Sequence, residues 1–298
     1  MELKQAKREK VKLRIGLSGA SGSGKTYSAI LLAYGIANDY SKIAIVDTEN
    51  NSASLYSHLG NYKALNLDAP YTPEKYIKAI ETCEKANMEV VIIDSISHEW
   101  IGTGGCLEIH HKLGGRFQDW AKVTPRHQSF IDKILRSNCH IITTARRKVG
   151  YSLNTMQNGR VKVVKLGTKE ITREGFEYEL TVNFQLLGEN HLCKASKDRT
   201  GLFMNKPEFK INAAIGKRLV NWSNNDKGLE QAKEEIQVCE TIEGLKHIYD
   251  KYPNYQNDLK ADVINRKTLI ESAKLKIVPS SEIVNNQNSE NNDIPTRE

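Results

Sequence analysis

The chain has 298 residues, of which 39% are hydrophobic and 27% are charged, and its formal net charge at pH 7 is +7. That length accommodates one large α/β domain and a small appendage, and no apolar run reaches the roughly 18–20 residues that a helix needs to cross a bilayer. The charged start of the chain lacks the apolar core of a signal peptide, and its five cysteines are irregularly spaced without a CxxC pair. These features exclude a disulfide framework and favour a cytoplasmic protein with reduced thiols and no membrane partner.

Apolar segments of strand length alternate with helical patterns through the first half of the chain. The sequence predicts buried strands at residues 13–18, 42–47, 89–94 and 140–145, and helices at residues 27–38, 72–86 and 125–136. Such alternation implies βαβ units around a mostly parallel sheet. The continuous Val and Ile runs are typical of strands that are covered on both faces.

The pattern changes in the second half of the chain. Residues 178–187 and 191–195 are predicted to be strands that close the domain, and an antiparallel pairing is open to them. From about residue 225 the sequence predicts three helices, at residues 228–238, 242–252 and 255–274. We therefore divide the chain into an α/β core at residues 1–224, a helical module at residues 225–278 and a polar tail at residues 279–298, which we expect to be disordered.

The strongest motif lies between the first predicted strand and the first predicted helix. It reads Gly19-Ala20-Ser21-Gly22-Ser23-Gly24-Lys25-Thr26 and matches G-x-x-x-x-G-K-[ST] in full. Glycines allow the backbone to wrap closely around a phosphate, and the helix N-terminus presents N–H groups to the anion. Lys25 is expected to contact the β- and γ-phosphates and Thr26 to ligate the metal, so the motif predicts binding of ATP with Mg²⁺.

Two carboxylates stand at the ends of predicted strands. Asp94 ends the third strand, where it is either a partner of Thr26 in holding Mg²⁺ or a solvated strand end. Glu49 follows the second strand, where it either polarises the attacking water or is an ordinary loop acid. We expect both to serve the nucleotide site, and Glu99 is the next candidate for the general base.

A glycine-rich stretch at residues 102–115 interrupts the alternation of strands and helices. It is either a nucleic-acid loop, with Trp100 stacking on a base beside His110, His111 and Lys112, or a mobile surface loop. A metal site built from His98, Glu99, His110 and His111 would lack a standard spacing. The aromatic residues Phe117, Trp120 and Phe130 are expected to lie in the core.

Positive charge is concentrated after the fourth predicted strand. Residues 146–175 contain eight Lys or Arg against two acidic residues. Clustered positive charge favours a polyanionic partner, usually a nucleic acid, whereas a solvated face is the alternative. The candidate contacts to a nucleic-acid backbone are Arg146, Arg147, Lys148, Arg160 and Lys162.

The order of these elements resembles the core of the RecA-type recombinases. Asp47-Thr48-Glu49 is similar to the segment that carries the catalytic glutamate in that family, and Asp94-Ser95 is similar to the end of its Walker B strand. Residues 145–150 resemble the passage from a sensor strand into the second DNA-binding loop, and Lys197-Asp198-Arg199 resembles the basic Lys-Asn-Arg element of RadA-type relatives. More closely, residues 13–203 resemble phage-encoded, RecA-like ATP-binding proteins of the AAA type, in the single-strand annealing and recombination group.

This resemblance implies a fold, an activity and partners. The fold is an α/β P-loop NTPase with a RecA-like, mostly parallel sheet flanked by helices, plus a small C-terminal helical module. The activity is ATP hydrolysis stimulated by single-stranded DNA in the cytoplasm of a bacterial host, with Glu49 and Lys25 as catalytic residues. Lys197 and Arg199 would reach the nucleotide of a neighbouring subunit in a ring or filament. Thr143, Thr144 and Ala145 depart from the family, which has a glutamine at the end of the sensor strand.

Two other functions are open to the sequence. A small-molecule P-loop kinase would use the same phosphate loop, with the basic residues 146–173 as a lid, although the Asp47-Thr48-Glu49 and Lys197-Asp198-Arg199 segments argue against it. A nucleotide-regulated binding module would bind ATP with negligible turnover.

The helical module has apolar residues at helical spacing, namely Leu245, Ile248, Tyr249 and Tyr252. They predict either a small core of the module's own or a docking face for a single-strand-binding protein.

Overall fold

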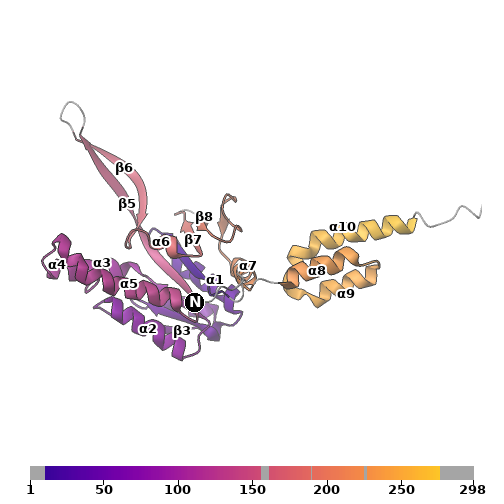
Figure 1. Cartoon of the computed structure of the whole chain (residues 1–298), viewed down its shortest axis with the longest axis horizontal. Helices are drawn as coiled ribbons and strands as arrows, with labels where there is room; N and C mark the ends of the chain where they lie inside the picture. Colours follow the sequence, from indigo (N-terminus) through magenta and orange to yellow (C-terminus); the bar gives the residue numbers. More distant parts are fainter. Residues whose placement is uncertain (1–10, 156–160, 189, 225–226, 276–298) are drawn as a thin grey trace, which may run out of the picture. The chain divides into compact units, whose positions relative to one another are not determined.

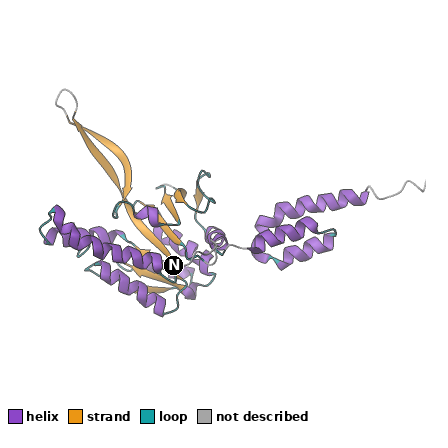
Figure 2. Cartoon of the chain, viewed as in Figure 1, coloured by secondary structure: helices purple, strands orange, loops and turns teal. Residues whose placement is uncertain are grey.

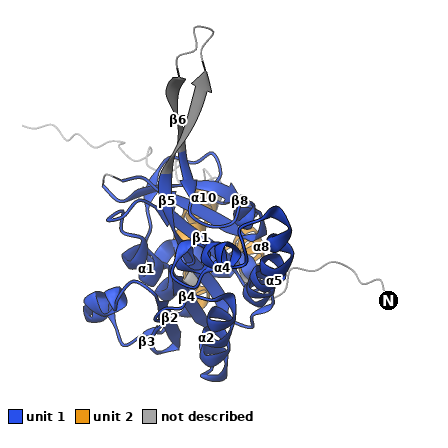
Figure 3. Cartoon of the chain, turned by 90° about the vertical axis from the view of Figure 1, so that its left-hand side faces the viewer, with its two compact units in different colours: residues 1–225 blue, residues 226–298 orange. Residues whose placement is uncertain are grey.

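The computed structural model describes residues 11–155, 161–188, 190–224 and 227–275. The chain divides into two compact units, residues 1–225 and residues 226–298, and each is described by itself (Figure 3). The predicted polar tail at residues 279–298 and Arg160 lie outside the described residues. Within those residues, no helix has both the length and the apolar character needed to cross a membrane.

A mixed, mostly parallel sheet forms the centre of the first unit (Figures 1 and 2). Its described strands are β1 Arg14–Gly19, β2 Ile43–Asp47, β3 Lys63–Asn66, β4 Val90–Asp94, β5 His140–Thr155, β6 Val161–Glu170, β7 Val182–Leu186, β8 Leu192–Asp198 and β9 Phe209–Lys210. Their order is β3-β2-β4-β5-β1-β7-β8-β9, with β6 paired to β5 outside this path. Along this spatial order, every pairing from β3 through β2, β4, β5 and β1 to β7 is parallel. Strands β8 and β9 add antiparallel pairings at one edge. The predicted fold class is confirmed.

Helices cover both faces of this sheet. They are α1 Lys25–Ala37, α2 Pro73–Lys85, α3 Ser97–Ile101, α4 Cys106–Lys112, α5 Trp120–Arg136, α6 Phe176–Glu179 and α7 Ala213–Ser223. Side chains of a strand alternate between its faces, and Ile45 of β2 accordingly joins the hydrophobic cluster around α1 while its neighbour Val46 joins the cluster around α2 and α5. The continuous Val and Ile runs of the sequence are thus explained by a sheet that is buried on both sides.

Two strands differ from the prediction. The sequence predicts an end near residue 145 for the fourth strand, but β5 runs on to Thr155 and pairs antiparallel with β6. The basic segment after residue 146 is therefore largely a β-hairpin, which projects from the sheet (Figure 1). The edge strand β3 is missing from the prediction because its sequence, KALN, has no apolar run and its residues are mostly exposed.

The glycine-rich stretch at residues 102–115, for which both sequence interpretations expected a loop, contains the helix α4 at its centre. His110 of α4 stacks on Trp120 with ring centroids 4.1 Å apart, and Trp120 stacks on Trp100 at 5.7 Å. Phe130 lies in the core as predicted, whereas Phe117 is 89% exposed, since it begins a short turn before α5. The aromatic rings of this region therefore pack mainly on one another.

A buried histidine begins β5. The backbone N–H of Leu13 donates a hydrogen bond to Nδ1 of His140 at 3.1 Å. Burial, together with the positive charges of Lys12 and Arg14, lowers the pKa of His140 to about 3. The ordinary pKa of histidine is about 6.5, so between pH 6.5 and about 3 the unfolded chain binds a proton that the folded chain does not.

We therefore expect this histidine to make the first unit less stable as the pH falls below about 6.5, by up to about 1.4 kcal/mol per pH unit. His140→Gln keeps an oxygen that can accept the Leu13 N–H but removes the titration. The free energy of unfolding of this variant should fall less steeply between pH 6.5 and 5 in denaturant titrations. Tryptophan fluorescence reports on the first unit, which contains all three tryptophans. His58→Gln, an exchange at an exposed site, is the control, and equal slopes in all three proteins would contradict the assignment.

The second unit consists of three described helices, α8 Lys227–Val238, α9 Ile242–Lys251 and α10 Gln256–Leu275. Its small core contains Ala232, Ile236, Leu245, Tyr255, Leu259 and Ile270. Ile248, Tyr249 and Tyr252 pack against that core, as the sequence interpretation proposed. The helices lie close to their predicted positions; α8 and α9 carry a clear apolar stripe, and α9 also begins at a helix-start signal, the Thr241 hydroxyl that accepts from the N–H of Gly244.

Candidate active site

The glycine-rich motif forms the turn between β1 and α1. Gly22 and Gly24 have φ angles of 76° and 89°, a left-handed conformation that glycine adopts without a steric cost. Gly24 is also the N-cap of α1, and a Cβ there would lie 2.9 Å from Nδ1 of His191. The turn therefore requires glycine at position 24 both for its path and for the close approach of His191. The first N–H groups of α1 have no partner within the helix and can bind an anion.

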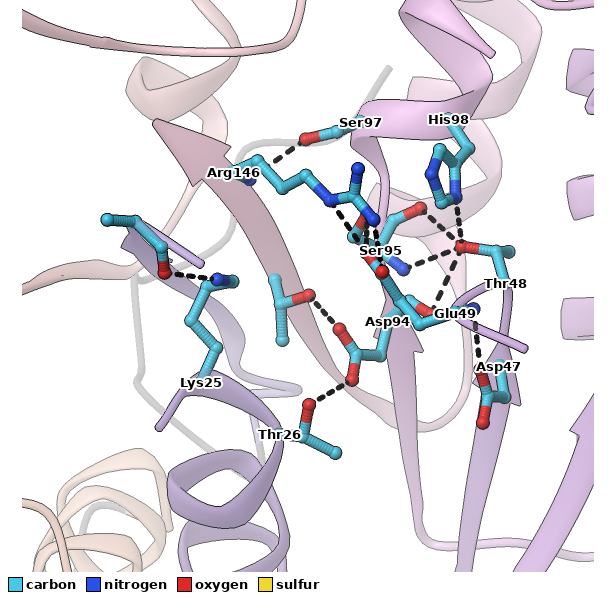
Figure 4. Close-up of polar contacts among 12 residues, drawn as sticks. Lys25, Thr26, Asp47, Thr48, Glu49, Asp94, Ser95, Ser97, His98 and Arg146 are labelled. Atoms are coloured by element: carbon cyan, nitrogen blue, oxygen red, sulfur yellow. Dashed lines mark hydrogen bonds and ion pairs between the residues drawn. The ribbon is translucent and has the colours of Figure 1, made fainter. Parts of the chain in front are cut away.

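Lys25 folds back over this turn (Figure 4). Its Nζ donates hydrogen bonds to the carbonyl oxygens of Ala20 at 2.8 Å and Gly19 at 3.2 Å. Burial lowers the pKa of Lys25, and the nearby carboxylates of Asp94 and Glu49 oppose this shift. The Lys25 amine therefore lies at the opening of the turn, which is the position from which it can contact a bound phosphate.

Asp94 ends β4 and has only 2% of its surface exposed. Its Oδ2 accepts a hydrogen bond from the Thr26 hydroxyl at 2.5 Å, and its Oδ1 accepts one from the Thr144 hydroxyl at 2.5 Å. Burial raises the pKa of Asp94, while these hydroxyl groups act in the opposite direction. Carboxylate and hydroxyl oxygens are hard ligands, and Mg²⁺ is usually held by one or two carboxylates together with substrate phosphates. Thr26 and Asp94 therefore fit the ion that the resemblance implies.

The carboxylate of Glu49 points toward Arg146 and Ser95 (Figure 4). Arg146 donates from Nε to Oε1 at 2.9 Å and from Nη2 to Oε2, while the Ser95 hydroxyl donates to Oε1 at 3.1 Å. Burial raises the pKa of Glu49, but the hydrogen bonds and charge of Arg146 outweigh it, so the pKa lies below its ordinary value. Asp47 fixes the segment that follows β2, because its carboxylate accepts from the N–H groups of Glu49 at 2.6 Å and Ala53 at 2.8 Å.

One cavity of about 610 Å³, within the size range of small-molecule sites, is lined by the glycine-rich turn together with Lys25, Thr26, Glu49, Asp94 and Arg146. Distant segments complete its wall with residues that sequence reasoning missed, namely Tyr27, Ser52, Tyr56, His191, Lys210 and Ile211. Of these, only Tyr27 adjoins the motif. No local signal marks the others, because their role depends on where the segments around η2 Ser52–Leu59 and β9 lie relative to the turn.

The structure corrects the expected position of two arginines. Arg146 lies in the cavity against Glu49 rather than along an exposed basic surface. Arg147 turns back to the sheet, where its Nη1 donates to the Ser18 hydroxyl at 3.1 Å and to Oε1 of Glu170 at 3.2 Å. Both arginines are held because β5 passes directly beside β1 and β4 before it enters the hairpin. Lys148 is exposed, and Lys162 pairs with Asn154 in the hairpin.

Lys197 and Arg199 lie apart from this cavity. Both donate to the carbonyl oxygen of Tyr178, Arg199 at 2.5 Å. Asp198 between them accepts from the N–H groups of Thr200 at 2.7 Å and Phe203 at 2.7 Å, which fixes the turn after β8. Neither cation lines the cavity.

Glu99 is not a reserve base for this cavity. It is 1% exposed, and its Oε1 accepts from the Cys106 thiol at 3.0 Å and contacts Nδ1 of His127 at 3.0 Å. The set of His98, Glu99, His110 and His111, which lacks a standard metal spacing, is also not brought together, because His98 instead contacts the Thr48 hydroxyl at 2.7 Å and His110 stacks on Trp120. Glu99, Cys106 and His127 bring three donor atoms within 4.8 Å of one another, but the three side chains satisfy one another through hydrogen bonds.

A family model described as an AAA domain matches residues 11–227. The match includes the strands of the sheet, the glycine-rich turn and α7, and it covers well over half of the chain. No curated protein matches the sequence.

Proposed function

The chain belongs to the AAA domain family of nucleotide-binding ATPases, and from this premise we propose that it hydrolyses ATP under the control of single-stranded DNA in phage or prophage recombination or single-strand annealing. The partners in this proposal are single-stranded DNA, further copies of the chain in a ring or filament, and a single-strand-binding protein. Lys197 and Arg199 would act on a neighbour's nucleotide. The site is the cavity between the glycine-rich turn, Glu49 and Asp94.

Each group of residues in this site has its own role in ATP hydrolysis. The N–H groups of residues 19–26 and the Lys25 amine bind the β- and γ-phosphates. Thr26 and Asp94 would hold Mg²⁺, which supplies positive charge to the phosphate oxygens when it is bound. Glu49 accepts a proton from the water whose oxygen attacks the γ-phosphorus, and the bond to ADP breaks as inorganic phosphate forms. Arg146 lowers the pKa of Glu49 and so keeps it ionised at neutral pH, but the same hydrogen bonds occupy both carboxylate oxygens, so Arg146 must move before Glu49 can accept that proton.

The observation that carries the regulatory part of the proposal is the pairing of Arg146 with Glu49. Both carboxylate oxygens of Glu49 accept from Arg146, so the arginine competes with water for the base. Arg146 stands on β5, and the same strand continues into the projecting hairpin. A polyanion bound to the hairpin can therefore move Arg146 through a continuous strand and release Glu49.

We expect binding of a single-stranded oligonucleotide to weaken with salt, with a log–log slope of roughly −0.7 per phosphate neutralised. Replacing Lys148, Arg160 and Lys162 together by Ala should weaken binding and reduce the magnitude of the slope by up to about 2. Arg146 and Arg147 stay unchanged in this variant, since they are bonded within the first unit. The control variant loses the same amount of charge away from the hairpin, by replacement of Lys63, Lys75 and Lys85 together by Ala.

ATP hydrolysis measured with and without the oligonucleotide completes this test. The wild-type chain should be stimulated, the hairpin variant should not, and Arg146→Ala should hydrolyse ATP at similar rates in both conditions. Absence of salt-sensitive DNA binding, with or without ATP, would contradict the proposed role in recombination. Transfer of the γ-phosphate to a small acceptor instead of water would then favour the P-loop kinase.

A further inference from the structure

The helical unit carries an apolar groove between α9 and α10. The groove has a volume of about 290 Å³, and four aliphatic side chains, one tyrosine and three lysines line it: Ile242, Leu245, Val263, Ile264, Tyr249, Lys246, Lys260 and Lys267. Ile264 has 53% of its surface exposed although it lies in the middle of α10. The core of the unit therefore does not use this side chain.

The rim of the groove is positively charged. Three lysines line it and no carboxylate does. Lys267 lies 3.8 Å from Glu271 on the next turn of α10, a type of surface pair that contributes little to stability. Among the described residues, Lys246 and Lys260 form no ion pair with a carboxylate. Elsewhere in the unit the cations do find partners, as Lys251 does with Glu235 at 2.9 Å.

From this combination we infer that the groove docks an acidic peptide segment of another protein, one that carries one or two bulky apolar side chains among aspartates or glutamates. A volume at the lower end of the range for small-molecule sites suits a few side chains better than a cofactor. The cationic rim complements carboxylates and would steer the encounter. An aliphatic floor with a single aromatic ring offers little for stacking nucleobases, which disfavours a nucleic acid here.

This inference deepens the proposed docking of a single-strand-binding protein, and it rests on the helical unit alone. The ATPase and DNA assays above do not involve the groove residues. Failure of the docking test would therefore leave the proposed ATPase standing, and failure of the ATPase would leave the groove to be tested.

The test is fluorescence anisotropy of the full chain with a panel of labelled acidic peptides that carry Leu, Ile or Phe at varied spacing. We expect Ile264→Asp to weaken binding about tenfold or more, because it removes apolar contact and adds a repelling charge. The matched control is Leu269→Asp, since Leu269 is also exposed on α10 but does not line the groove, and it should change affinity less than about twofold. Lys246→Glu combined with Lys260→Glu should weaken binding by about tenfold or more and reverse its decrease with salt.

Each of the following outcomes would overturn the inference. The first is that no peptide of the panel binds the wild-type chain. The second is that Ile264→Asp and Leu269→Asp bind equally well. The third is that removal of residues 276–298 raises peptide affinity about tenfold, which would identify the chain's own tail as the occupant. The fourth is that an oligonucleotide displaces the peptide, which would identify a nucleic acid as the occupant of the groove. The fifth is that light scattering shows a dimer which Ile264→Asp dissociates, which would identify a second copy of the chain as the occupant. Circular dichroism of each variant checks that the helices remain folded.

Discussion

Replacing Lys25 by Ala is expected to weaken ATP binding by about 30- to 4,000-fold, which corresponds to about 2–5 kcal/mol for a charge removed opposite a bound charge. The amine lies at the opening of the phosphate turn and, among the residues that the structure describes, donates to the carbonyl oxygens of Gly19 and Ala20 alone. Because no apolar packing depends on those contacts, the first unit should stay folded. Titration calorimetry with ATP and Mg²⁺ measures the affinity, and a thermal melt without nucleotide checks the fold.

Lys63→Ala is the matched control for this experiment. Lys63 is an exposed lysine on the edge strand β3 and does not line the cavity. Its removal lowers the net charge by the same amount and should leave the affinity for ATP unchanged. If Lys25→Ala binds ATP as tightly as the wild-type chain, the glycine-rich turn is not the phosphate site.

Glu49→Gln is expected to retain ATP binding and to lose hydrolysis by about 10²–10⁴-fold, the usual cost of removing a positioned general base. The amide keeps the size of the side chain and an oxygen that Arg146 can bond, so the cavity keeps its shape. Single-turnover hydrolysis measures the loss, and titration with ATP separates it from binding. Turnover in mixtures of Glu49→Gln with Arg199→Ala also tests catalysis in trans, because a site that combines Glu49 of one copy with Arg199 of another would regain activity that neither variant has alone.

The control for this second prediction is Glu89→Gln. Glu89 is exposed and immediately precedes β4, at the opposite end of that strand from Asp94, so its replacement should not affect hydrolysis. Unchanged turnover in Glu49→Gln would assign the base to another group. Glu99 could not take its place, because it is buried against Cys106 and His127 and does not line the cavity.

Much of the fold could be predicted from local sequence. Strands β2 and β4 are short Val- and Ile-rich segments and β1 is a short segment that ends at glycine, and all three are buried on both faces of a parallel sheet. The glycine-rich motif predicted its own turn, because the left-handed conformation of Gly24 and the helix that follows are encoded within a few residues. Lys25, Thr26 and Asp94 could be assigned to one site in advance for a different reason, because the carboxyl ends of parallel strands meet at one edge of a sheet.

Only the tertiary structure decided which charged residues are exposed to solvent and which are paired with other side chains. Residues 146–148 read as one basic run, yet Arg146 meets Glu49, Arg147 meets Ser18 and Glu170, and only Lys148 is exposed. The side-chain partners of Arg146 and Arg147 lie between 21 and 129 positions away in sequence, so no local pattern could reveal them. A charge in sequence shows only that a side chain must be solvated or paired. Whether it faces water, a carboxylate or a ligand depends on which strands the fold places beside it.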